Sequence, residues 1–189
     1  MKVLATVALI LNFGVAGIYA QPNPVNMTLS GTAARSTITL LGTPASEYQL
    51  AGNGALGQFT LRVVSNGMAS PQESNTCSGP TKAYFPVVAG AGVFRSQDGG
   101  LLKVGLTGGG DCIDFAAGQA LCTRIFQVMG GTGRFANASG GTLTLTMTVV
   151  PVLADGSPTN PVFFTVTGEV TGAIPGVALD DSQAQHAQP

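Results

Sequence analysis

Apolar and polar residues alternate along most of the chain. The clearest case is 142–149, where four apolar residues alternate with four threonines. A second alternating segment covers 162–170, and a turn-forming Asp-Gly-Ser-Pro sequence at 155–158 lies between the two. Successive side chains of a strand point to opposite faces of its sheet, so this alternation indicates strands with one buried face. The two segments are therefore expected to pair as an antiparallel hairpin.

Further segments have the composition of strands, and Gly, Asn or Pro residues separate them. They are 27–41, 58–64, 83–94 and 101–106. After residue 25, apolar residues do not recur at helical spacing without a Gly or Pro among them, so almost no helix is expected. The expected fold is all-β, an antiparallel barrel of eight or more strands, and a β-sandwich is the alternative.

The composition indicates one folded, exported domain. Hydrophobic residues make up 44% of the 189 residues and charged residues only 9%, which excludes a disordered chain. Residues 1–20 combine one Lys with a long apolar run, which is typical of a secretory signal peptide cleaved after Ala20. We therefore expect a single barrel domain at 21–173, a disordered tail at 174–189, and a secreted or periplasmic location.

Charge and residue content disfavour several partners and cofactors. Eight Lys and Arg against nine Asp and Glu leave no basic surface for nucleic acid. The single His, His186, lies near the chain end, and Asp111 and Asp114 offer too few ligands for calcium, so no metal site is expected. No membrane span is expected after signal removal. An outer-membrane barrel is disfavoured because the chain has no Trp and three Tyr.

The chain has three cysteines, and export would place them where disulfides persist. Cys112 follows a glycine-rich run and Cys122 begins an apolar segment, so a bridge between them would join the ends of a loop between neighbouring strands. We expect the Cys112–Cys122 disulfide, with Cys77 free or paired between chains. The alternative is a bridge from Cys77 to one of the other two.

Charged residues within strands are candidate ligand-binding residues because they are so rare here. Arg124 shares one face of its segment with a cysteine, a phenylalanine and a valine. A guanidinium on the core face would need a carboxylate or an anionic ligand, and Asp114 and Glu169 are the expected partners. Tyr84 is a candidate pocket aromatic. In the opposing interpretation, Arg124 lies on an exposed or interfacial face and these residues are solvated or packed.

The sequence Gly-Gly-Thr-Gly-Arg-Phe-Ala at 130–136 follows an apolar strand, like the glycine-rich fingerprint of dinucleotide-binding proteins. That fingerprint requires a helix to begin at the glycines, whereas 137–141 reads Asn-Ala-Ser-Gly-Gly. We therefore expect a structural turn with positive φ at one or more glycines, and no cofactor. The turn residues are Gly130, Gly131, Gly133 and Phe135.

The same run carries a family resemblance. An apolar strand, a Gly-Gly-Thr-Gly turn, a Phe and a second Gly-Gly pair at 126–145 resemble the central region of the allene oxide cyclase and dirigent superfamily, and the likeness covers Leu121 to Gly172. The resemblance implies an eight-stranded antiparallel barrel, often trimeric, whose lumen handles hydrophobic small molecules without a cofactor. The matching positions are turn residues, so the resemblance assigns no catalytic residue.

Three functions follow from this reading. The first is a secreted binding module that holds an apolar small molecule or a partner protein and performs no catalysis. The second is a cofactor-free cyclase or isomerase that acts on a hydrophobic substrate in the lumen, with Arg124 and a carboxylate stabilising a polarised transition state. The third is a structural or adhesive surface protein, which threonine- and glycine-rich strands of low charge would suit. The scarcity of acids and of His disfavours the enzyme.

Overall fold

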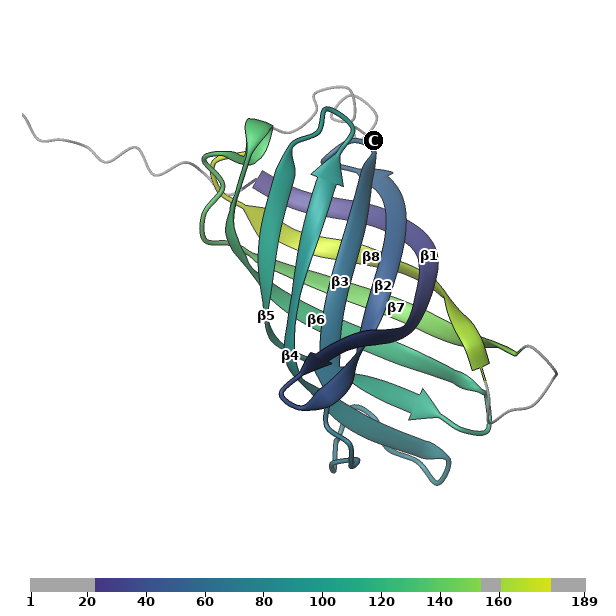
Figure 1. The fold of residues 1–189 in the computed structure, drawn as a ribbon. Coiled ribbons are helices and arrows are strands. Elements are labelled where there is room, and N and C mark those ends of the chain that lie inside the picture. The colour runs from purple at the N-terminus through teal and green to yellow at the C-terminus, as the bar shows by residue number, and fades with distance from the viewer. Residues whose placement is uncertain (1–22, 154–160, 178–189) are drawn as a thin grey trace, which may run out of the picture.

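The computed structural model describes residues 23–153 and 161–177, and they form one closed antiparallel barrel with strands in chain order (Figure 1). The elements are β1 (Asn23–Leu40), β2 (Thr43–Gly54), β3 (Phe59–Gly67), β4 (Lys82–Ser96), β5 (Leu101–Asp114), β6 (Gln119–Gly131), the short 3-10 helix η1 (Gly133–Phe135), β7 (Thr142–Leu153) and β8 (Pro161–Ile174). The expected eight-stranded barrel is confirmed, and the sandwich alternative is not. The expected signal peptide and the predicted 155–158 turn lie outside the described residues.

The alternation in the sequence separates the inside of the barrel from the outside. In β7, Leu143, Leu145 and Met147 are fully buried, whereas the threonines between them lie on the outer face. β7 and β8 pair antiparallel, as the alternation predicted. No helix in the described part of the chain has the length and apolar character needed to cross a membrane.

Side chains fill the interior of the barrel. Every strand contributes buried apolar residues to a single core cluster, as expected for a barrel of eight strands, whose interior is just wide enough for side chains. The largest fully buried side chains include Met27, Leu61, Phe94, Phe126, Leu143 and Met147. The interior is therefore a packed core.

One end of the barrel is closed by segments that follow β2, β6 and β8. Leu56, Phe135 and Ala138 are buried there, together with Ile174 and Val177. β8 extends to Ile174, so this residue and Val177 belong to the packed barrel, whereas the sequence placed the start of the tail at Ile174. The rest of that expected tail, 178–189, lies outside the described residues.

The glycine-rich run at 130–136 makes the turn that leads from β6 into η1. Gly130 and Gly133 have positive φ values of 122° and 59°. Gly131 is constrained by space, because a methyl group there would lie 2.3 Å from the Leu101 carbonyl oxygen. η1 is three residues long and ends at the buried Phe135.

The disulfide joins Cys77 to Cys112, and Cys122 is a buried free thiol, so the expected Cys112–Cys122 bridge is wrong. The register explains the difference. Cys122 pairs with Asp111 across β5 and β6, whereas Cys112 pairs with Leu121, which is 54% exposed. Cys112 therefore points to the outer face and Cys122 to the core. On the outer face, Cys112 anchors the loop between β3 and β4 to β5.

Candidate functional site

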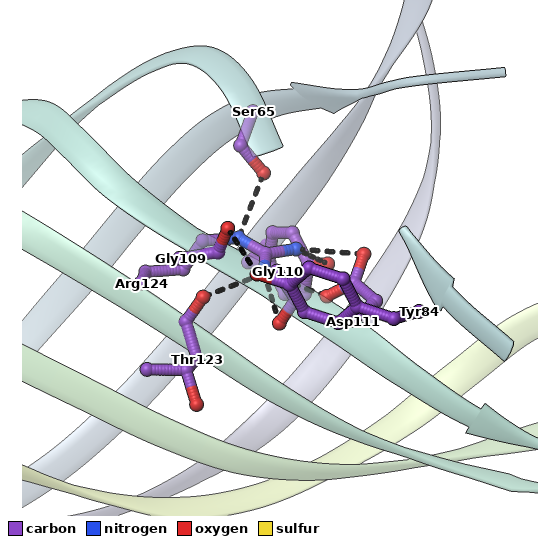
Figure 2. Close-up of polar contacts among 8 residues, drawn as sticks. Ser65, Tyr84, Gly109, Gly110, Asp111, Thr123 and Arg124 are labelled. Carbon is purple, nitrogen blue, oxygen red and sulfur yellow. Dashed lines mark hydrogen bonds and ion pairs between the residues drawn. The ribbon is translucent and has the colours of Figure 1, made fainter. Parts of the chain in front are cut away.

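Arg124 lies inside the barrel, near the end that carries the loop between β3 and β4 and the turn between β5 and β6. Its side chain is 2% exposed. Residues from three other strands surround its guanidinium: Tyr48 of β2, Ser65 of β3 and Asp111 of β5. Figure 2 shows the Ser65 and Asp111 side chains and the Thr123 backbone converging on it. The solvent-exposed alternative for Arg124 is therefore wrong.

Every N–H of the Arg124 guanidinium has an acceptor. Nη1 and Nη2 donate to the two carboxylate oxygens of Asp111, at 2.6 and 3.2 Å. Nη2 also donates to the Tyr48 hydroxyl at 3.0 Å, and Nη1 donates to the Thr123 carbonyl at 3.0 Å. Nε donates to the Ser65 hydroxyl at 3.2 Å. Because a guanidinium has five N–H donors, this arrangement leaves none for a ligand.

The buried groups around Arg124 are shifted away from neutral pH. Desolvation opposes the charge of Arg124, but Tyr48 and Asp111 outweigh it, so the pKa of Arg124 lies above its ordinary value. Desolvation by burial raises the pKa of Tyr48 to about 12. Burial also raises the pKa of the Cys122 thiol well above its ordinary value, and the Asp111 charge adds to the shift. A catalytic acid or base works best with a pKa near the working pH, so these shifts favour a structural role.

The Arg124 cluster therefore acts as a polar cross-link between β2, β3, β5 and β6. Sequence reasoning identified Arg124 but not its partners Asp111, Tyr48 and Ser65. Asp111 was assigned to a loop because the predicted strand stopped at residue 106, whereas β5 continues to Asp114. Continuing the alternation through the three glycines before Asp111 would have placed its side chain on the face of Cys122.

The two carboxylates expected to pair with Arg124 lie elsewhere. Asp114 accepts hydrogen bonds from the backbone N–H groups of Ala116 and Ala117 and from the Thr81 hydroxyl, at 3.0 to 3.1 Å. These bonds, that from Ala117 above all, hold the pKa of Asp114 below its ordinary value. Glu169 is exposed on β8, where it pairs with threonines of β1 and β7. Asp114 thus stabilises a turn, and Glu169 faces solvent.

Tyr84 lies on the outer face of the sheet. It pairs with Cys112, and its hydroxyl donates to the Gly109 carbonyl at 3.2 Å. A methyl group at Gly110 would overlap the Tyr84 ring at 2.3 Å, so the ring lies directly against this backbone. Tyr84 also lines a hollow of about 530 Å³ beneath the loop between β3 and β4. Figure 2 shows its ring beside Gly110 and Asp111.

The larger hollow lies on the outside of the barrel, across β1 to β4. We call it the outer groove; its volume is about 800 Å³. Its lining residues are Thr28, Leu29, Ala51, Gly52, Asn53, Gln58, Phe59, Thr60, Arg95, Ser96 and Gln97. At the outward-facing centre, Ala51 pairs with Ser30 and Thr60, so small side chains here leave the sheet surface open. Sequence reasoning assigned none of these residues to a site.

The outer groove offers neutral hydrogen-bonding groups and one cation. Three amides, three hydroxyls and the Arg95 guanidinium line it, while Leu29 and Phe59 are buried beneath it. The described residues hold no group of three or more His, Cys, Asp or Glu placed to bind a metal ion. Such a surface can hydrogen-bond a polar ligand.

Comparison with protein-family models, with curated proteins and with solved structures finds no match for this chain.

Proposed function

We propose that the protein is a non-catalytic binding module that holds a carbohydrate in the outer groove. The observation that carries the proposal is the hollow of about 800 Å³ lined by amide and hydroxyl side chains. Amide groups both donate and accept hydrogen bonds, and hydroxyls do the same, so together they match the hydroxyl groups of a sugar.

The ligand is placed outside the barrel because buried side chains fill the interior. This moves the site away from the lumen, which the resemblance to the allene oxide cyclase and dirigent superfamily implies as the binding place. It also replaces the apolar ligand expected from the sequence with a polar one, since the groove presents mainly hydrogen-bonding groups.

A carbohydrate suits this groove better than an extended peptide does. Peptides that add a strand to a sheet need a free edge, and a closed barrel has none. Peptides that dock through side chains need apolar pockets, whereas the centre of the groove is the small Ala51 side chain.

The cyclase alternative is less well supported by the site. Arg124, the residue expected to stabilise a polarised transition state, already donates all its N–H groups within the protein. The carboxylates expected to assist it, Asp114 and Glu169, do not reach it. A trimer, which the family resemblance implies, stays a prediction.

An exported module fits the disulfide. A bond between Cys77 and Cys112 is compatible with a secreted or periplasmic protein, because such bonds persist in oxidising compartments. We include the signal peptide at 1–20 in the proposal. Extracellular sugars would then be the accessible ligands.

A matched pair of tryptophan variants tests the proposal. Thr60 is exposed within the groove and Thr148 is exposed on β7, outside it, so Thr60→Trp fills the groove and Thr148→Trp controls for the added indole. Binding would be measured on an array of glucose, galactose, mannose, N-acetylglucosamine and uronate oligomers. We expect one or more oligomers to bind the wild type and Thr148→Trp but not Thr60→Trp. No binding by any oligomer, or equal binding by both variants, would refute the proposal.

A further inference from the structure

A second hollow adjoins the outer groove at the η1 end of the barrel. Its volume is about 280 Å³, and the turns after β2 and β4 form it together with Arg134 of η1. Gln58 and Gln97 line both hollows, so a ligand in the groove can extend into the second one. Figure 1 shows η1 and the turn between β4 and β5 at the same end of the molecule. We call this hollow the Arg134 pocket.

Arg134 has hydrogen-bonding capacity that the described residues do not use. Its Nε and Nη2 atoms are buried, and neither has an acceptor among the residues that the structure describes. Its guanidinium lies over the Phe135 ring, 5.2 Å from the ring centre. Arg124 shows the contrast, because each of its donors is paired. Buried donors without a partner are unfavourable, so an acceptor supplied from outside would relieve this cost.

The unpaired donors suit a carboxylate. The N–H groups of Nε and Nη2 lie on the same edge of the planar guanidinium and point in the same direction, and this edge binds the two oxygens of a carboxylate side by side. The edge is covered in the barrel as it stands, so Arg134 must turn outward on binding. The interaction exchanged is the contact over Phe135, a weaker interaction than a paired, charge-assisted hydrogen bond.

Asp98 adds a negative charge to the same pocket. Its Oδ1 accepts hydrogen bonds from the Ser96 hydroxyl and from the Gly100 backbone N–H. These two bonds, the first above all, hold the pKa of Asp98 below its ordinary value, so the carboxylate stays charged. It opposes an anionic ligand, and removing its charge should strengthen binding at Arg134.

We propose that the carbohydrate bound in the outer groove is acidic, and that Arg134 binds the carboxylate of one of its uronate units. The inference rests on the proposed function, since the groove holds the rest of the sugar chain. It names the class of ligand, a uronate-containing oligosaccharide, and adds Arg134 as a residue that determines specificity.

The test compares each acidic sugar with its neutral counterpart. Oligomers of galacturonate, glucuronate and mannuronate would be titrated calorimetrically beside the same oligomers with the carboxyl groups reduced to alcohols. We expect one or more uronate oligomers to bind the wild type about tenfold or more tightly than the reduced form. Arg134→Gln should bring the uronate affinity down to that of the reduced oligomer, while Asp98→Asn should raise it.

Lys103→Gln is the matched control, because it removes a positive charge from an exposed position of β5 outside both hollows. It should leave the preference for the uronate unchanged, and thermal unfolding would verify that each variant folds. If uronate and reduced oligomers bind alike and Arg134→Gln changes neither, the inference fails while the proposed function stands. If no oligomer binds, acidic or neutral, both fail.

Discussion

The Arg124 guanidinium lies among apolar side chains, and the Asp111 carboxylate on the adjacent strand balances its charge. The pair is stabilised further because Tyr48 and Ser65 accept the remaining side-chain donors from across the interior. Breaking a buried ion pair by removing one partner is costly, since the other charge and its hydrogen-bonding groups lose their partner. At the scale of the residue, Arg124 is therefore needed for stability.

Replacing Arg124 with methionine should destabilise the barrel without affecting the groove. We expect Arg124→Met to lower the free energy of unfolding by about 3 kcal/mol in urea titrations. The control is Arg62→Met, which breaks the ion pair with Glu47 on the outer surface, where Arg62 is 69% exposed, and should change stability little. Equal stability of Arg124→Met and the wild type would contradict the structural role.

Alkaline pH should weaken the fold through the buried Tyr48 hydroxyl. Its pKa is about 12 in the barrel against an ordinary value of 10.0, so the unfolded chain releases this proton first. The native state then binds more protons than the unfolded state, and stability falls as pH rises from about 10 to about 12. The buried Cys122 thiol acts in the same direction from lower pH, because its pKa is also raised.

The check is urea unfolding of the wild type and of Tyr48→Phe at a series of alkaline pH values. The variant should be less stable at neutral pH, since Arg124 loses an acceptor, but its stability should fall less steeply above about pH 10. Parallel pH profiles for the two proteins would count against a buried, protonated Tyr48.

At the scale of the strands, the sequence predicted faces better than register. Alternation separated the buried from the exposed residues of β7 and predicted its pairing with β8. It did not give the one-residue offset between β5 and β6, which directs Cys112 outward and Asp111 inward. Glycines caused the error, because a run without side chains carries no alternation and the predicted strand was ended at the run. The disulfide and the partner of Arg124 were both missed for this reason.

Peptide mapping without reduction tests the register directly. We expect one linked pair of peptides containing Cys77 and Cys112, and a Cys122 thiol that reacts with an alkylating agent only after unfolding, because it is buried. In the chain-entropy model, a loop with a sequence separation of 35 residues is worth about 4 kcal/mol. Reduction should therefore lower the melting temperature. A peptide linking Cys112 to Cys122 would show that the β5–β6 register is different.

A second test at this scale concerns the turn that leads into η1. Gly131→Ala should destabilise the protein by roughly 1 kcal/mol or more, because the added methyl would meet the Leu101 carbonyl oxygen and the Phe135 Cβ at 2.3 and 2.5 Å. Gly108→Ala is the matched control, since its methyl would find only the Ile125 side chain, at 3.8 Å. The comparison is made by thermal unfolding, and a cost at Gly108 equal to that at Gly131 would argue against the described turn.

At the scale of the whole molecule, the filled interior directs binding to the outer surface. The outer groove could not be predicted from the sequence, because Thr28, Asn53, Thr60 and Arg95 look like ordinary solvated positions of four separate strands. Barrel closure places these strands side by side, and the small Ala51 side chain leaves the space between them open. Arg134 was likewise seen only as part of a turn, because its unpaired donors are a property of the folded chain.

The most direct test of where this protein binds its ligand is an NMR titration of backbone amides with the oligosaccharide that binds most tightly. We expect shift changes at Thr28, Asn53, Thr60 and Gln97, which lie in the outer groove. The amides of Tyr48, Asp111 and Arg124, at the opposite end of the interior, should not change. Shifts confined to those interior residues, or shifts that avoid the groove, would contradict an outer binding site.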